Sequence, residues 1–155
     1  MGLFCYTYNM NIIFVCHGNI CRSPVGEILL NKLINENGVK GINVISRATS
    51  FEEIGNDIYP PMKRVLTSHG ISFNRHYATR ITQREFDDAD YIFYMDSNNL
   101  YYLERMFGTS NKFHLISEYS DGKEVEDPWY TDRFEYVYSL IDEYVKTIYK
   151  KVVNG

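Results

Sequence analysis

The chain has 155 residues, of which 45% are hydrophobic and 23% charged, and this is enough for one domain with a sizeable core. Its formal net charge is −4 at pH 7 and it has no long basic run, so nucleic acid and anionic membranes are poor default partners. It has three cysteines, an odd number that argues against a disulfide framework and favours a reducing, cytoplasmic setting.

Residues 1–9 are predicted to form a short N-terminal extension, ahead of a domain that spans residues 10–155. The segment is too short and uncharged to serve as a signal peptide. Gly2 is present, but Tyr6 stands where a myristoylation signal prefers Ser or Thr. No apolar stretch in the chain approaches the roughly 20 residues that a membrane-spanning helix needs, so no membrane partner is expected.

The apolar run NIIFV at 11–15 predicts a buried parallel strand, and a helix is predicted to follow at 24–37. Pro24 suits the first turn of this helix, and Gly38 is a stop signal. Its apolar residues lie at helical spacing: Val25, Ile28, Leu29 and Leu33. The next predicted elements are a strand at 42–46, a helix at 59–70, a weak extended piece at 71–73, a short helix at 81–89, a strand at 91–95, a helix at 97–107, a strand at 112–116 and a polar loop at 117–131. Thr82 is the predicted N-cap of the short helix, with Glu85 three residues on.

A long helix at 131–152 is predicted to close the chain. Its apolar stripe consists of Phe134, Val137, Tyr138, Ile141, Tyr144, Val145 and Ile148. Because strands alternate with helices along the chain, the sequence predicts one doubly wound α/β domain, with a four-stranded parallel sheet flanked by helices. Ligands in such folds bind beyond the carboxyl ends of the strands, so the loop after the first strand is the expected site.

That loop lies within the stretch VCHGNICRSP at 15–24 and has the features of an anion site. A helix N-terminus offers unpaired N–H groups and partial positive charge, and a tight loop before it can turn more N–H groups inward. Gly18 allows close approach of the backbone, and Asn19 tolerates a left-handed conformation. Arg22 adds a planar set of donors, so the loop predicts a site for phosphate or another tetrahedral oxyanion.

Cys16 lies at the start of the same loop, where the helix N-terminus and Arg22 favour the thiolate form. The hydroxyl of Ser23 can support the anion. These residues predict phosphoryl transfer to sulfur followed by hydrolysis. The best candidate for the required general acid is Asp127, in the stretch EDPWYTD. Trp129 and Tyr130, which follow Pro128, are predicted to form walls that contact the ring of an aromatic phosphate ester. The alternative interpretation is that these two aromatic side chains only pack against the protein.

The motif C-H-G-N-I-C-R-S-P closely resembles the phosphate loop of low-molecular-weight protein tyrosine phosphatases, and the resemblance covers nearly the whole chain from Met10 onward. Three further segments are similar to family segments: SRATS at 46–50, MDSNNL at 95–100 and EDPWY at 126–130. His76, before Ala78-Thr79-Arg80, also has a counterpart in the family. A loop of this kind near the N-terminus together with a distant D-P-aromatic-aromatic motif is much more specific than CX5R alone.

The resemblance implies a phosphotyrosine phosphatase I-like fold and a protein tyrosine phosphatase that hydrolyses phosphotyrosine and small aryl phosphates. It implies Cys16 as nucleophile, Arg22 as phosphate binder and Asp127 as acid and base. The other residues that it implies are His17, Gly18, Asn19, Ile20, Cys21 and Ser23 in the phosphate loop, and Ser46 and His76 as supports. It implies no metal and no cofactor. The implied partners are phosphotyrosine proteins and phosphate or other oxyanions, with a monomeric or weakly self-associating chain.

Several positions depart from the family. His17 replaces the apolar residue common after the nucleophile, which predicts a different rim charge and pH sensitivity. Phe51 and Glu52 stand where the family often has an aromatic wall, and Glu52 there would make the wall more acidic. Arg47 also replaces a small residue.

Several alternatives stand beside this prediction. An arsenate reductase needs further cysteines downstream, and none follows Cys21. Relatives that act on phosphoarginine carry Thr at the place of Ile20, whose apolar side chain favours an aromatic ring. A catalytically silent phosphopeptide-binding module is the third alternative. Cys21 is equally well interpreted as a core cysteine or as a redox partner of Cys16, and Asp96 as a helix cap or loop anchor.

Overall fold

A parallel sheet of four strands forms the centre of the molecule in the computed structural model, which describes residues 10–155. The predicted extension at 1–9, with Gly2, Cys5 and Tyr6, lies outside the described residues. The strands are β1 (Met10–Cys16), β2 (Ile42–Ala48), β3 (Tyr91–Tyr94) and β4 (Phe113–Leu115). Their order across the sheet is β2-β1-β3-β4, and every neighbouring pair is parallel. The carboxyl ends of all four strands therefore meet at one edge of the sheet.

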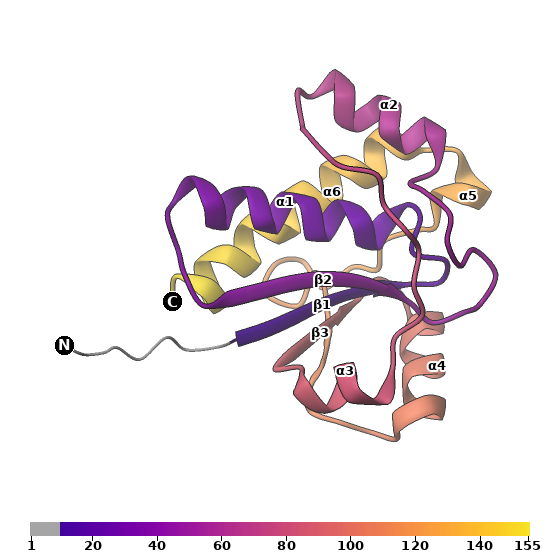
Figure 1. The fold of residues 1–155 in the computed structure, drawn as a ribbon, viewed down its shortest axis with the longest axis vertical. Coiled ribbons are helices and arrows are strands. Elements are labelled where there is room, and N and C mark those ends of the chain that lie inside the picture. The colour runs from indigo at the N-terminus through magenta and orange to yellow at the C-terminus, as the bar shows by residue number, and fades with distance from the viewer. Residues whose placement is uncertain (1–9) are drawn as a thin grey trace.

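Helices cover both faces of the sheet (Figure 1). One face carries α1 (Arg22–Glu36), α2 (Pro60–Ser68) and α6 (Phe134–Ile148), and the other carries α3 (Gln83–Asp88) and α4 (Ser97–Phe107). A short helix α5 (Pro128–Thr131) precedes α6, and a π-helical turn η1 (Tyr149–Val153) follows it. This arrangement confirms the predicted doubly wound α/β fold.

Successive side chains of β1 are buried alternately in two separate hydrophobic cores, one on each face of the sheet. Ile12 and Phe14 are fully buried in the core beneath α1 and α6, while Ile13 and Val15 are buried on the α3 and α4 side. All seven residues of the predicted stripe on α6 are buried, as expected. Burial of each such side chain contributes roughly 1.5–3 kcal/mol to the hydrophobic driving force, so β1 is the element on which both layers depend.

Most predicted elements are present, with two corrections. The helix predicted at 131–152 begins only at Phe134, and the segment predicted as a loop at 117–131 contains α5, which Asp132 ends with a left-handed conformation at φ 64°. In α1 the buried face includes Leu30 and Ile34, whereas Ile28 and Leu33, which the spacing placed on that face, are only half-buried. The helix is therefore turned slightly from the predicted orientation.

A close approach between α1 and β1 explains the glycine inside the helix. A Cβ atom on Gly26 would lie 2.7 Å from Cδ1 of Phe14, below any normal contact distance. The helix axis therefore sits tightly against the strand, and the loop that joins the two elements is held short. No helix within residues 10–155 combines the length and the apolar content needed to cross a bilayer.

Candidate active site

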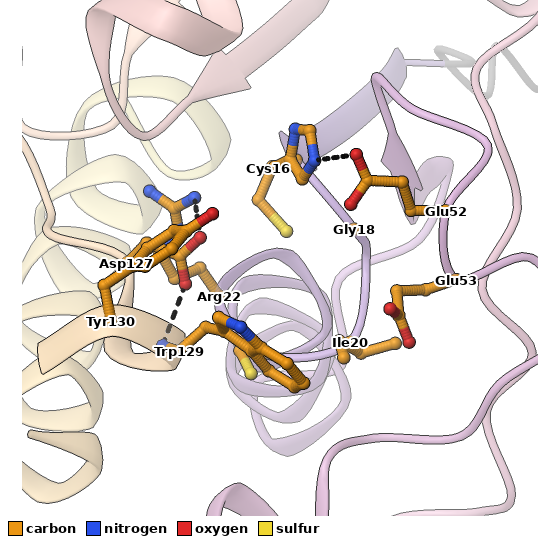
Figure 2. Close-up of a pocket in the computed structure, with 11 residues that line it drawn as sticks. Cys16, Gly18, Ile20, Arg22, Glu52, Glu53, Asp127, Trp129 and Tyr130 are labelled. Atoms are coloured by element: carbon orange, nitrogen blue, oxygen red, sulfur yellow. Dashed lines mark hydrogen bonds and ion pairs between the residues drawn. The ribbon is translucent and has the colours of Figure 1, made fainter. Parts of the chain in front are cut away.

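A cavity of about 100 Å³ opens at the carboxyl edge of the sheet, directly above the loop between β1 and α1 (Figure 2). Its lining comes from three separate segments of the chain. The lining residues are Cys16, His17, Gly18, Ile20, Cys21, Arg22, Glu52, Glu53, Asp127, Trp129 and Tyr130. Figure 2 shows Glu52 and Glu53 on one side of the cavity, Asp127 and Tyr130 on the other, and Cys16 between them.

The sulfur of Cys16 lies at the base of this cavity and is surrounded by donors. The backbone N–H groups of Asn19 and Ser23 point at Sγ, at N···S distances of 3.3 and 3.4 Å. The hydroxyl oxygen of Ser23 lies 3.0 Å from Sγ and itself accepts a hydrogen bond from the Asn19 amide at 2.8 Å. The hydroxyl of Ser23 can donate to this sulfur or, at 3.4 Å, to the carbonyl of Arg47. Donors that converge on one sulfur in this way favour the charged form of a thiol over the neutral form.

Asn19 fixes the shape of the loop from within. Its backbone is left-handed, with φ 61°, and its side chain is fully buried. The amide group donates to Ser23 and to Ser46 Oγ at 3.0 Å and accepts from the N–H of Thr79 at 3.0 Å. His76 Nε2 donates to the Asn19 carbonyl at 2.6 Å. Ser46 and His76, both expected as supports, therefore contact the loop through this one residue.

Glu27 completes the network and was not predicted from the sequence. It lies on the second turn of α1, and its Oε1 accepts a hydrogen bond from Ser46 Oγ at 2.6 Å. Its position four residues after Ser23 places it on the same face of the helix, and this spacing is the signal that could have identified it. The chain Glu27–Ser46–Asn19 holds the phosphate loop against β2.

Arg22 is almost completely buried, with 2% of its surface exposed. Its Nη1 donates to Asp96 Oδ2 at 2.6 Å and to the carbonyl of Val125 at 2.9 Å, and Nη2 lies 3.5 Å from Asp127 Oδ2. Burial disfavours the charged guanidinium, but the negative charges of Cys16, Asp96 and Asp127 outweigh it, and the pKa of Arg22 is raised. With Nη1 occupied, Nη2 is left for a bound oxyanion.

Asp96 has both of the roles that the sequence suggested for it as alternatives. It is the N-cap of α4, where its side chain accepts the N–H of Asn99 at 2.9 Å. Its second carboxylate oxygen is the one that orients Arg22. Since Asp96 follows β3 at the carboxyl edge of the sheet, its position in the fold could have identified this contact.

Asp127 lies on the wall opposite Glu52, on the segment that begins α5. Its Oδ1 accepts the N–H of Trp129 at 3.0 Å and its Oδ2 faces Arg22, so the carboxyl group is held above the floor of the cavity. The indole ring of Trp129 packs against Tyr59, with ring centroids 4.8 Å apart, while its exposed part lines the cavity. Tyr130 also lines the cavity and is 82% exposed.

The second wall differs from the prediction at one position. Phe51 does not line the cavity, because its ring is exposed and lies beneath the guanidinium of Arg80, 4.2 Å from the centroid. Glu52 takes the wall position, and its carboxylate lies 3.1 Å from His17 Nε2. The two departures that the sequence revealed separately thus form one ion pair, which it did not predict.

Cys21 and Cys16 are both free and buried. Burial, then the negative charges of Cys16 and Asp127, raise the pKa of the Cys21 thiol, so this thiol remains protonated near neutral pH. A disulfide between Cys16 and Cys21 stays a prediction. Within residues 10–155, no three His, Cys, Asp or Glu side chains are grouped so that they could hold a metal ion.

The arrangement brings together the three groups that phosphoryl transfer to sulfur requires. A sulfur lies among hydrogen-bond donors, a buried guanidinium lies beside it, and a carboxyl group stands on the wall above. Positioning and electrostatic stabilisation of this kind supply most of the catalysis in phosphoryl transfer.

Comparisons with known proteins agree with this chemistry. A family model described as "Low molecular weight phosphotyrosine protein phosphatase" matches residues 11–154. The chain is 37% identical over 138 residues to the low molecular weight protein-tyrosine-phosphatase YfkJ of Bacillus subtilis, a match that covers 85% of this chain and 88% of YfkJ. It is 39% identical over 140 residues to the low molecular weight phosphotyrosine protein phosphatase of Homo sapiens, which covers 83% of this chain and 86% of the human protein.

Solved structures give the same result. The crystal structure of YfkJ matches with a TM-score of 0.88 at 32% identity, covering 94% of this chain and 95% of YfkJ. A structure of the YwlE arginine phosphatase matches with a TM-score of 0.82 at 25% identity, covering 94% of this chain and 99% of YwlE.

Proposed function

Because the chain belongs to the low molecular weight phosphotyrosine protein phosphatase family, we propose that it hydrolyses phosphotyrosine in proteins, and small aryl phosphates, through a cysteinyl-phosphate intermediate. The observation that carries the proposal is the set of donors around Cys16 Sγ, at the base of a cavity shared with Arg22 and Asp127. Its substrates are then phosphoproteins, and its products are a tyrosine side chain and inorganic phosphate.

In the first step, the Cys16 thiolate attacks phosphorus while the bond from phosphorus to the phenolic oxygen breaks. The three non-bridging oxygens lie in the loop, where backbone N–H groups and Nη2 of Arg22 receive them. Asp127 gives its proton to the departing phenolic oxygen, which leaves as the neutral tyrosine. Asp96 acts through Arg22 as a positioning residue, since its carboxylate holds Nη1 at 2.6 Å and leaves Nη2 for the oxyanion.

In the second step, water attacks the phosphorus of the cysteinyl phosphate. Asp127, now ionised, takes a proton from this water, and the S–P bond breaks to return the thiolate and release phosphate. The hydroxyl of Ser23, 3.0 Å away, donates a hydrogen bond to the sulfur as negative charge returns to it. The same carboxyl group therefore acts as acid and then as base, and the enzyme ends in its starting state.

The shape of the cavity supports an aromatic substrate. Trp129 and Tyr130 form one wall and Ile20 contributes an apolar contact near the floor. A phosphorylated phenol is long enough to place its phosphate against Cys16 while its ring contacts these side chains, whereas phosphoserine is shorter and has no ring. The need for a reduced Cys16 nucleophile supports a reducing, cytoplasmic compartment, and a monomeric or weakly associating chain remains our expectation.

The test compares turnover of an aryl phosphate with that of matched phosphotyrosine, phosphoserine and phosphoarginine peptides. We expect hydrolysis of the aryl phosphate and the phosphotyrosine peptide, with no turnover in Cys16→Ser and inhibition by vanadate or phosphate but not by chelators. Phosphoarginine is included because YwlE, a structural relative, is an arginine phosphatase. Preferred cleavage of phosphoarginine, or binding without turnover in the unaltered protein, would contradict the proposal.

A further inference from the structure

The rim of the cavity is acidic although its floor binds an anion. Glu52 and Glu53 both line the cavity from the segment that follows β2, and Asp127 faces them from the other wall. Among the lining residues of the described chain, Arg22 alone carries a permanent positive charge, and it lies buried at the floor. A phosphate dianion must therefore pass two carboxylates before it reaches the loop.

Within residues 10–155, the one ion pair that these two carboxylates make is that between Glu52 and His17. Glu53 accepts a hydrogen bond from the neutral amide of Asn56 at 2.9 Å. Glu52 pairs with His17, whose positive charge depends on pH, and its side chain is 68% exposed. The nearest arginine in this wall, Arg80, stacks on Phe51 and donates Nε to the carbonyl of Thr49 at 3.1 Å.

We propose that Glu52 and Glu53 select phosphotyrosines that have a lysine or arginine beside them in the substrate chain, and that His17 sets the strength of this selection according to pH. The proposal rests on the proposed function, because it assigns the substrate class of the same site. The exposed carboxylate of Glu52 lies at the outer edge of the cavity, where a residue that flanks the phosphotyrosine passes, and the long side chain of Lys or Arg reaches it.

The pH dependence follows from the ion pair. When the ring of His17 is protonated, the imidazolium 3.1 Å from Glu52 compensates its charge, and a basic substrate residue gains little. When the ring is neutral, Glu52 is left uncompensated, and the preference for a basic residue rises. The other charged groups that face His17 are Cys16 and Arg22 in its own loop, Glu53 beside Glu52, and Asp127 across the cavity. Cys16, Arg22 and Asp127 act on the phosphate, which is the same in every substrate, so their effect cancels in a ratio of two substrates. Glu53 adds to the preference for a basic residue at every pH of the experiment.

The experiment measures kcat/KM for phosphotyrosine peptides whose two residues on each side are lysines or glutamates, from about pH 5.5 to about pH 7.5 at low salt. We expect the unaltered protein to favour the lysine peptide about tenfold at the upper pH and about threefold at the lower pH, since each exposed charge pair contributes modestly. Glu52→Gln and Glu53→Gln should each reduce the ratio, and Glu52→Lys should invert it. His17→Gln should hold the ratio high at every pH.

Two controls separate this proposal from the proposed function. Turnover of a small aryl phosphate reports the chemistry without flanking residues. Binding of both peptides to Cys16→Ser, followed by the fluorescence of Trp129, the only tryptophan in the chain, reports the preference even without turnover. Glu104 is exposed on α4, and Glu104→Gln should leave the ratio unchanged.

Two results would overturn the selection of basic flanking residues by Glu52 and Glu53. One is rates on the two peptides within twofold of each other at low salt, and the other is an unchanged ratio in the double variant that carries Glu52→Gln and Glu53→Gln. A ratio that still varies with pH in His17→Gln would overturn the role of His17.

Discussion

At the scale of single residues, Asn19 does most to fix the phosphate loop. A left-handed backbone costs a residue other than glycine roughly 1–2 kcal/mol, and here the buried hydrogen bonds of the amide offset it. Asparagine therefore meets two needs at this position: its side chain makes the buried hydrogen bonds, and its backbone tolerates the left-handed conformation that the loop requires.

We expect Asn19→Ala to lower the free energy of unfolding by about 2–4 kcal/mol, because it leaves the N–H of Thr79 without its partner and keeps the backbone strain. Asn19→Gly removes the same hydrogen bonds but relieves the strain, so it should be about 1 kcal/mol more stable than Asn19→Ala. Urea unfolding of both variants measures the difference. Equal stabilities would show that the strain is not significant.

The role of Asp127 predicts a dependence on the leaving group. Asp127→Asn cannot supply a proton, so turnover of phenyl phosphate should fall by about 10²- to 10⁴-fold. p-Nitrophenyl phosphate releases a weakly basic phenolate that needs the proton less, and its turnover should fall by less. Steady-state kinetics on the two esters checks this, and an equal loss on both would argue that Asp127 serves only to orient Arg22.

The residues that the sequence identified at the site are those with a local signature. Cys16, Asn19, Arg22 and Ser23 lie in one loop whose spacing indicates an anion site. The hydrogen bond between Ser46 and Glu27 and the ion pair between Arg22 and Asp96 were not predicted, because each joins segments brought together only by the packing of helices on the sheet. The ion pair between His17 and Glu52 was not predicted for a similar reason, since it depends on the path that the segment after β2 takes.

At the scale of secondary structure elements, the packing of α1 on β1 is the tightest contact next to the site. We expect Gly26→Ala to destabilise the protein by about 1–2 kcal/mol, because overpacking against Phe14 outweighs the better helix propensity of alanine. Thermal unfolding measures this change. Phe14→Leu makes room for the new methyl group, so the double variant should be less destabilised than the sum of the two single variants. Simple additivity would contradict the predicted clash.

Elements with strong end signals were predicted best. The helix predicted at 97–107 has those bounds in the structure, where Asp96 caps it and Gly108 ends it with φ 81°. The capping box of Thr82 and Glu85 is also confirmed. Helix α5 and the later start of α6 were missed, because they depend on the left-handed backbone of Asp132, a conformation that aspartate adopts too rarely to be predicted from sequence.

At the scale of the whole molecule, several carboxylates accept hydrogen bonds that join separate segments of the chain. Their lowered pKa values predict that the protein loses stability in acid. Burial opposes the ionisation of Asp57, but hydrogen bonds from Lys63 and from the N–H groups of His76 and Ile58 prevail and lower its pKa to about 2. Hydrogen bonds from the backbone of Lys123 and from Tyr144 lower the pKa of Asp121, and Arg133 lowers that of Glu126.

Each of these groups has a lower pKa in the folded than in the unfolded protein. Its contribution to stability is therefore complete above the unfolded-state pKa of about 4 and is lost as pH falls through the folded-state pKa, which for Asp57 is about 2. We expect the urea midpoint to fall over this range. In Asp57→Asn the fall should be smaller, because the variant has no proton to take up at this position. A fall of the same size in both proteins would show that other groups govern acid unfolding.

The hydrogen bond from Arg22 to Val125 joins residues 103 positions apart, and the other supports of the loop come from Glu27, Ser46, His76, Thr79 and Asp96. During synthesis the ribosome therefore makes the nucleophile early and its last structural partner about a hundred residues later. A chain that stops short of Val125 has the thiol but lacks one of the two acceptors that orient Arg22, and it lacks Asp127 as well. We therefore expect such a chain to show no turnover of an aryl phosphate.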